Sequence, residues 1–187
     1  DNKKVENVEF TVTNTRFFEK FCEGRFAEHL PRITTRICGI CPIPHHLTAV
    51  KSVEAAWGVQ VPSAGLKLRK LMSYAKQYAS HLLHFYALAA PDFLFGPFAD
   101  PAKRNVVAVI NALPDVGAQA FKMMDFGQSI SQTIGAKAVH PVTAVPGGMK
   151  RRLDEGERDA FLQQTDDQLE MVQNTVNLAL DVVNKYW

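Results

Sequence analysis

Residues 66–90, LKLRKLMSYAKQYASHLLHFYALAA, carry a long helical pattern that begins after Pro62 and Ser63. One apolar stripe of this segment consists of Leu68, Met72, Ala75, Ala79, Leu82, Tyr86 and Ala89. A second stripe, on a neighbouring face, consists of Tyr74, Tyr78, His81, Phe85 and Leu88. A helix that is apolar over so much of its circumference packs against the protein on more than one side. The segment therefore predicts the central helix of a larger helical assembly.

Helical patterns also lie on both sides of this segment. The expected helices cover residues 16–23, 45–57, 101–113, 115–134 and 155–187. Gly135 is placed as a C-terminal stop for the fourth of them. Asp154, followed three residues later by Glu157, forms a capping-box pattern at the start of the last one.

The expected β structure lies at the N-terminus. In residues 4–13, KVENVEFTVT, apolar residues alternate with mostly polar ones, which predicts a half-buried strand. The segment 137–153, KAVHPVTAVPGGMKRRL, is a turn-rich connector whose Gly147 and Gly148 lack the spacing of a phosphate loop and indicate a plain turn. The fold class is therefore mainly α with a small N-terminal β element, in a single domain over residues 1–187.

Composition excludes several classes of protein. Lysine and arginine number 21 against 19 acidic residues, and this net charge of +2 is too weak to indicate nucleic-acid binding. No apolar run approaches the roughly 18–20 residues that a membrane span needs. Three cysteines, an odd number, and the lack of a signal peptide disfavour a disulfide scaffold and indicate a reducing, cytoplasmic location.

The segment that indicates chemistry is RICGICPIPHH, residues 36–46. Two thiols separated by two residues can face one point, which suits a soft metal ion or redox exchange. Gly39 is expected to allow the tight path between them, and Arg36 is expected to favour thiolate over thiol.

Several chemistries are compatible with such a pair. A thioredoxin-like site needs a strand before the motif and a helix directly at it, and Pro42 and Pro44 disfavour that arrangement. A structural zinc site needs four ligands. Cys38 and Cys41 would have to be joined by His45 or His46, or by His81 and His84, and neither set has finger-like spacing. Two buried structural cysteines are the remaining simple interpretation.

The same segment resembles the N-terminal cysteine motif of the large, catalytic subunit of nickel–iron hydrogenases, R-x-C-G-x-C-x-x-x-H. The matching positions are Arg36, Cys38, Gly39, Cys41 and His45. The segments LHFYALAAPDF (83–93), DPAKRNV (100–106) and VHPVTAVPGG (139–148) resemble segments that follow in the same order in that family. The resemblance is greatest to the soluble cytoplasmic branch, with its NAD-linked and deazaflavin-linked or methanogen-type enzymes, and it implies part of an α+β large-subunit fold.

The resemblance implies roles for individual residues. Cys38 would be a terminal thiolate ligand of nickel, and Cys41 would bridge nickel and an iron that carries small diatomic ligands. His45 would donate a hydrogen bond towards the bridging sulfur, and Arg36 would orient or pack. His140 would lie near the cofactor or the electron-transfer partner, the alternative being a loop histidine that bonds to the backbone.

The activity implied is reversible oxidation of H2 to protons and electrons. The electrons would pass to an iron–sulfur small subunit, then to further electron-transfer subunits. The family's second C-x-x-C and its R-x-E-G-H segment are absent from these 187 residues. We therefore expect an N-terminal-half fragment, inactive alone and without an assembled Ni-Fe centre, that exposes apolar surface and self-associates. A chain that begins without Met and ends inside a helical pattern at Trp187 agrees with that expectation.

Two other functions remain as alternatives. One is a non-catalytic, hydrogenase-like subunit of a respiratory complex, which retention of Cys38 and Cys41 disfavours. The other is a small zinc-binding module that uses the same two cysteines. Among the remaining polar residues, His81 and His84 are expected to be core histidines, Cys22 a buried filler and Glu28 a surface carboxylate.

Overall fold

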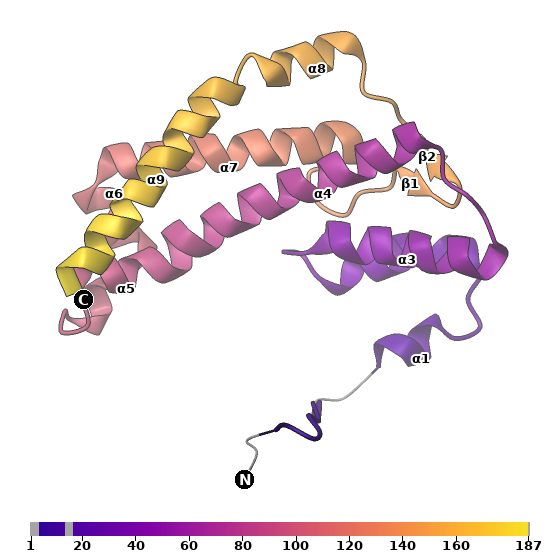
Figure 1. The fold of residues 1–187 in the computed structure, drawn as a ribbon, viewed down its shortest axis with the longest axis horizontal. Coiled ribbons are helices and arrows are strands. Elements are labelled where there is room, and N and C mark those ends of the chain that lie inside the picture. Colours follow the sequence, from indigo (N-terminus) through magenta and orange to yellow (C-terminus); the bar gives the residue numbers. More distant parts are fainter. Residues whose placement is uncertain (1–3, 14–16, 187) are drawn as a thin grey trace.

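The structure is a computed structural model that describes residues 4–13 and 17–186 (Figure 1). Its elements, in order, are α1 (Phe18–Cys22), η1 (Ala27–His29), α2 (Leu30–Thr34), η2 (Thr35–Ile37), α3 (Pro42–Trp57), α4 (Ser63–Leu83), η3 (His84–Ala89), α5 (Ala90–Phe95), η4 (Pro101–Lys103), α6 (Val106–Ala112), α7 (Pro114–Gly135), β1 (Ala144–Val145), β2 (Gly148–Met149), α8 (Glu155–Leu162) and α9 (Thr165–Tyr186). The prediction of a mainly helical fold is confirmed.

The centre of the molecule is the pair α4 and α7, which run side by side along most of their lengths (Figure 1). Gly127 of α7 allows the close approach, because a Cβ at this position would lie 2.7 Å from the Ala75 carbonyl oxygen of α4. α3 and the β1–β2 hairpin pack at one end of the pair, and α9 lies across its other end. The central helix that the sequence predicts is thus covered on more than one side, as expected.

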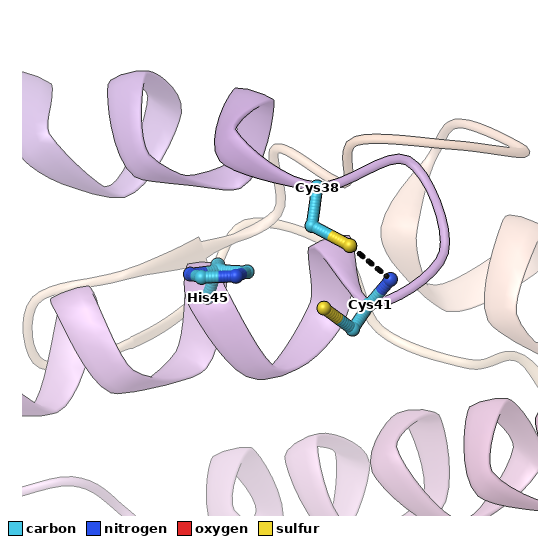
Figure 2. A group of neighbouring side chains, drawn as sticks. All are labelled: Cys38, Cys41 and His45. Carbon is cyan, nitrogen blue, oxygen red and sulfur yellow. Dashed lines mark hydrogen bonds between the residues drawn. The ribbon is translucent and has the colours of Figure 1, made fainter. Parts of the chain in front are cut away.

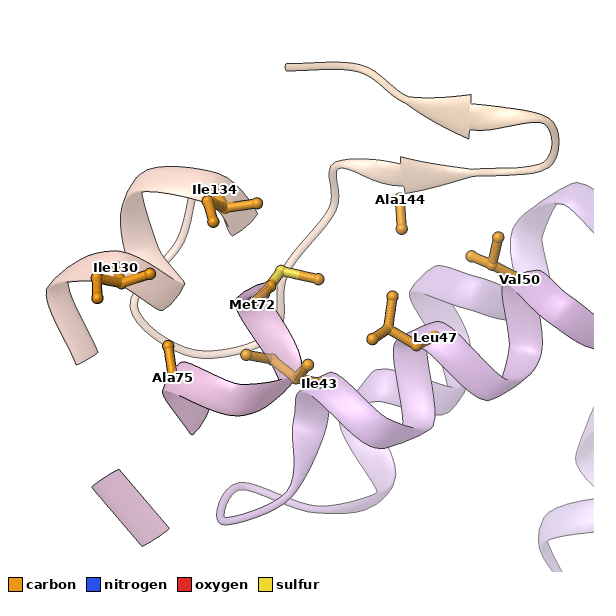
Figure 3. Close-up of a cluster of buried hydrophobic side chains, with 8 residues drawn as sticks. All are labelled: Ile43, Leu47, Val50, Met72, Ala75, Ile130, Ile134 and Ala144. Atoms are coloured by element: carbon orange, nitrogen blue, oxygen red, sulfur yellow. The ribbon is translucent and has the colours of Figure 1, made fainter. Parts of the chain in front are cut away.

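Each end of the α4–α7 pair has its own hydrophobic cluster. The first joins α3, α4, α7 and β1 through Ile43, Leu47, Val50, Met72, Ala75, Ile130, Ile134 and Ala144 (Figure 3). The second contains Leu82, Tyr86, Ala120 and Met123, against which α9 packs Met171, Val172 and Leu178. Burial of these apolar side chains is the main force that fixes the helices on one another.

Hydrogen bonds from buried or half-buried side chains place α9. The Tyr78 hydroxyl donates to Gln168 Oε1 over 2.9 Å, and Tyr86 Oη lies 2.6 Å from Thr175 Oγ1. Burial raises the pKa of Tyr78 to about 12, so this hydroxyl stays a donor over the physiological range.

Three of the predicted helices are divided in the structure. The long helix changes at His84 into the π-helical η3 before α5, where Pro91, which has no N–H, cannot continue regular α-helical bonding. The segment 101–113 splits because the Asn105 side chain accepts the Ala108 N–H and caps α6. The last pattern divides into α8 and α9, and α8 begins with the predicted capping box of Asp154 and Glu157.

The predicted N-terminal strand is wrong. Residues 4–13 have no regular secondary structure, and their side chains are exposed, Phe10 at 90%. A strand needs a neighbour to pair its backbone groups, and the described residues offer this segment none. The β structure is instead the hairpin of β1 and β2 inside the expected connector, with Ala144 opposite Met149 and Val145 opposite Gly148. Gly147 turns it with a φ of 88°, so the prediction of a plain turn is confirmed.

The outer faces expose large apolar side chains, as expected. On α9 and the end of α8 they include Leu162, Leu169, Val176, Leu180 and Val183. No helix among residues 4–13 and 17–186 is long and apolar enough to cross a bilayer.

Candidate metal centre

The two cysteines lie on the loop between η2 and the first turn of α3. Cys38 is extended after η2 ends, and Cys41 occupies the N-cap of α3, just before Pro42 at its first position. The backbone N–H of Cys41 donates to Cys38 Sγ over 3.2 Å, so the loop curls around the first sulfur. Gly39 is not needed for this path, because a Cβ there would meet no atom within 4 Å and its φ is not left-handed.

His45 completes a group of three donors with the cysteine pair. One turn into α3, its imidazole offers a ligand nitrogen, and this nitrogen and both Sγ atoms all lie within 4.8 Å of one another (Figure 2). All three side chains are half-buried, so solvent and a metal ion can reach them. Thiolate and imidazole are the donors that nickel, zinc and iron accept, which makes this a fitting site for such an ion.

The two thiols differ in acidity. Hydrogen bonds from the Cys41 thiol and from the backbone of Cys41 and Ile40 lower the pKa of Cys38. The pKa of Cys41 is raised, because its thiol donates to Cys38 and is partly desolvated. The first proton therefore leaves from Cys38, and the remaining thiol stabilises the thiolate that forms.

The cation near the thiols is Lys76 of α4, which the sequence interpretation missed. Its charge favours both thiolates, while its own pKa is lowered by burial. Arg36, expected to play this part, is exposed, and the charge that acts to lower the pKa of both cysteines comes from Lys76 instead. A sign of Lys76 was present in the sequence, because this lysine directly follows Ala75 of the packed stripe.

His140 lies against the segment that leads into the cysteine loop. Its Nδ1–H donates to the Thr35 carbonyl oxygen over 2.7 Å. His140 is therefore a loop histidine that bonds to the backbone, as in the alternative interpretation. The backbone group that it contacts belongs to Thr35, three residues before Cys38. Thr35 itself is fully buried and was not singled out by the sequence.

The other histidines do not join the site. Among the described residues, His45 is the only histidine in the group of possible metal ligands. His46 is buried with both ring nitrogens in use: Nδ1 lies 2.9 Å from the Pro31 carbonyl, and Nε2 accepts the Ala144 N–H over 3.2 Å. Burial lowers the pKa of His46, which keeps it neutral for these two bonds.

The expectation that His81 and His84 are core histidines is wrong, because both are exposed on the outer side of their helix. Glu28 is exposed, as expected, and Cys22 is only half-buried. A zinc site that joins the two cysteines to His81 and His84 is excluded, because neither histidine belongs to the group of possible ligands. A site that uses His45 remains.

The chain is similar to known hydrogenases over its whole length. The family model for nickel-dependent hydrogenase matches residues 16–104. One vhu subunit of the F420-non-reducing hydrogenase from Methanocaldococcus jannaschii is 50% identical over 186 residues, which are 100% of this chain and 44% of that protein. The beta subunit of the NAD-reducing hydrogenase HoxS from Cupriavidus necator is 33% identical over 100% of this chain and 41% of its own length.

Solved structures agree with these relatives. The crystal structure of an NAD+-reducing NiFe hydrogenase in the H2-reduced state matches with a TM-score of 0.88 and 36% identity, over 93% of this chain and 39% of that one. The Ni-Fe-Se hydrogenase from D. vulgaris Hildenborough matches with a TM-score of 0.78 and 27% identity, over 91% of this chain and 37% of the other. The present chain thus spans about two fifths of the length of the proteins that it resembles.

Proposed function

Because the chain belongs to the nickel-dependent hydrogenase family, in the branch of the F420-non-reducing and NAD-reducing enzymes, we propose that it supplies Cys38 and Cys41 to the nickel–iron centre of a hydrogenase catalytic subunit. The observation that carries the proposal is the meeting of both sulfurs and a His45 nitrogen within 4.8 Å, at the positions of the family motif.

In this proposal Cys38 would bind nickel, and Cys41 would bind both nickel and iron. Cys38, the more acidic thiol, offers a ready thiolate, while Cys41 lies at the N-cap of α3. His45 would donate a hydrogen bond towards the Cys41 sulfur and so tune the basicity of that sulfur. Arg36, which is exposed, would orient the loop from the edge of the site.

The bound centre, with the diatomic ligands of its iron, would supply the heterolytic cleavage of H2. The chain's own contribution is to hold two sulfurs in place and to accept a proton at Sγ of a thiolate. Lys76 offsets the negative charge of the two thiolates, which lowers the cost of keeping them together in a half-buried place. The electrons would pass to an iron–sulfur small subunit, then to further electron-transfer subunits, in the cytoplasm.

The chain alone supplies half of the thiolates that this centre needs. No cysteine follows Cys41, so we propose that the isolated chain does not assemble the complete centre or turn over H2. The exposed apolar faces of α8 and α9 agree with a need for further polypeptide or for self-association.

Metal analysis of the chain tests the proposal. The chain is expressed without air in a host that matures nickel–iron hydrogenases, and bound nickel, iron and zinc are measured alongside H2-dependent dye reduction. We expect a thiolate-to-nickel absorption band on titration with Ni2+, its loss in Cys38→Ser and Cys41→Ser, and no dye reduction. Failure of Ni2+ to bind through these cysteines would contradict the proposed site. Hydrogen-dependent dye reduction with stoichiometric nickel would contradict the incompleteness of the chain.

A zinc module is the second candidate function, and the His45 nitrogen beside the two sulfurs is the observation that favours it. Three nitrogen and sulfur donors leave one place open in a tetrahedral site. One equivalent of tightly bound zinc that nickel cannot displace, together with loss of zinc in His45→Ala, would favour this candidate over the hydrogenase centre.

A further inference from the structure

Thr35 closes the cysteine loop at both ends. Its hydroxyl donates to the Pro42 carbonyl oxygen over 3.0 Å, which ties the residue before the loop to the residue after it. Its own carbonyl oxygen accepts the hydrogen bond from His140 Nδ1 at 2.7 Å. Since Thr35 is fully buried, neither bond is exchanged readily for a bond to water. Hydrogen bonds of Thr35 thus fix both ends of the loop of residues 36–41, and Thr35 is itself bound by a histidine 105 residues further along the chain.

His140 holds this position in an unfavourable backbone conformation. Its φ is 56°, in the left-handed region that a residue with a Cβ seldom adopts. The residue before a proline is also biased towards extended backbone, and Pro141 follows directly. Strained residues of this kind persist only where the surrounding structure fixes them, and they cluster at functional sites.

The neighbours of His140 show what fixes it. Pro141 is fully buried against α7, so closely that a Cβ on Gly135 would lie 2.9 Å from the Pro141 Cβ. The next residue, Val142, donates its N–H to the Gly135 carbonyl oxygen over 3.1 Å. The end of α7 therefore determines the place from which the imidazole reaches Thr35.

We propose that His140 is a positioning residue for the Cys38–Cys41 pair, which acts through Thr35 and contacts neither sulfur. This inference rests on the proposed metal site and names a determinant of its geometry. The strained backbone aims Nδ1–H at the Thr35 carbonyl, Thr35 holds both ends of the loop, and the loop then presents two sulfurs at one point before a metal arrives. Without this link the loop would keep its sequence and lose its fixed shape.

Four variants separate the hydrogen bond from the backbone strain. His140→Asn keeps an N–H donor near Nδ1 and tolerates a left-handed φ, whereas His140→Gly relieves the strain and removes the donor. His140→Ala keeps the strain and removes the donor. The matched control is Ala136→Gly, because Ala136 is the other described non-glycine residue with a positive φ, 60°, and its side chain offers no hydrogen bond.

Amide hydrogen exchange of the reduced, metal-free chain is the first measurement. We expect exchange over residues 36–41, including the Cys41 N–H, to rise about tenfold or more in His140→Ala and His140→Gly. It should stay near the wild-type value in His140→Asn and in the control. Urea unfolding of each variant corrects the exchange rates for global stability. Unchanged exchange in the Ala and Gly variants would overturn the proposal.

Titration with Co2+ is the second measurement, since its thiolate charge-transfer and d–d bands report how the sulfurs are placed. We expect the affinity to fall about 10- to 100-fold and the bands to change in the Ala and Gly variants, with recovery in Asn. Identical bands and affinities in all variants would refute the positioning role and leave the metal site standing. If the wild-type chain binds no Co2+ through its cysteines, the proposed site fails, and the exchange experiment still decides whether His140 orders the loop.

Discussion

Two regions of the molecule, the contact of α3 and α4 with the β1–β2 hairpin and the cysteine loop of residues 36–41, differ in how they are stabilised. Arg69 and Glu54, with side chains 4% and 8% exposed, form a two-pronged ion pair between α4 and α3. Arg69 also donates to the Val145 and Gly148 carbonyls of the hairpin. The cysteine loop is half-exposed and has one internal hydrogen bond, from the Cys41 N–H to Cys38 Sγ. The residues that hold it in place, Thr35 and His140, lie outside the loop. The difference indicates that the packed helices and the hairpin determine the free energy of unfolding, whereas the loop determines the geometry of the site. Mutations in the two regions should therefore have separable effects.

The largest loss of stability should come from Arg69→Met. It leaves the Glu54 carboxylate buried without its cation and frees two hairpin carbonyls, so unfolding in urea should show a loss of about 3–5 kcal/mol. Arg158→Met is the control, because the pair of Arg158 and Asp159 is exposed and contributes little. A loss below about 1 kcal/mol for Arg69→Met would mean that this pair does not anchor the hairpin.

A smaller loss should follow from Gly127→Ala, which tests the α4–α7 contact. The new Cβ would lie 2.7 Å from the Ala75 carbonyl oxygen, a backbone atom that cannot move aside, so we expect a loss of about 1–3 kcal/mol. Gly156→Ala, in α8, meets only ordinary contacts and should stabilise the chain by up to about 1 kcal/mol. Equal effects of the two substitutions in urea unfolding would show that the helices separate more easily than the structure indicates.

The dependence of stability on pH should sharpen the same contrast. Hydrogen bonds from Arg69 lower the pKa of Glu54 below its ordinary value of 4.5. The unfolded chain therefore takes up this proton first, and the stabilisation is present above pH 4.5 and lost as the pH falls through the lower folded pKa. In urea unfolding at pH 7, 5, 4 and 3, Glu54→Gln should lose less stability on acidification than the wild type. Asp159→Asn, at an exposed pair, should follow the wild-type profile.

The smallest change in stability should come from the cysteines themselves. Cys38→Ser and Cys41→Ser alter half-exposed side chains on the loop, so unfolding free energies should stay within about 0.5 kcal/mol of the wild type. The Ni2+ charge-transfer band should nevertheless disappear. A loss of several kcal/mol (about the size expected for a buried core residue) would show that the pair is structural, as in the interpretation of two buried cysteines.

The success of each sequence-based prediction depended on how local its signal was. The capping box at Asp154 and the curl of the C-x-x-C loop need only neighbouring residues, and both are confirmed. The helix end predicted at Gly135 comes one residue later, because Gly135 is the last helical residue and Ala136 takes the left-handed cap position. The strand expected over residues 4–13 failed because alternation describes a strand's faces and does not provide the partner that it must pair with.

The histidines show the same limit within one helix. His81 shares a helical face with Tyr78 and Phe85, which predicts burial, yet that face is covered by α9 only in part. The degree of burial depended on where a helix 90 residues later would dock, since the Tyr78 hydroxyl bonds to Gln168. Lys76 and Thr35 were missed for a related reason, because each acts through a contact that only the packed fold creates, Lys76 with the thiols and Thr35 with His140.

By itself, the sequence determined the helical class, the thiol pair with its neighbouring His45, and the family that these residues indicate. Those properties follow from spacing along one helix or one loop, where chain connectivity sets the distances. Only the tertiary structure decided which cation stands beside the thiols, which histidine is buried and what holds the loop. Lys76 reaches the thiols from α4, and His140 reaches Thr35 from beyond α7. Contacts between residues so far apart exist only once apolar burial has packed the helices together.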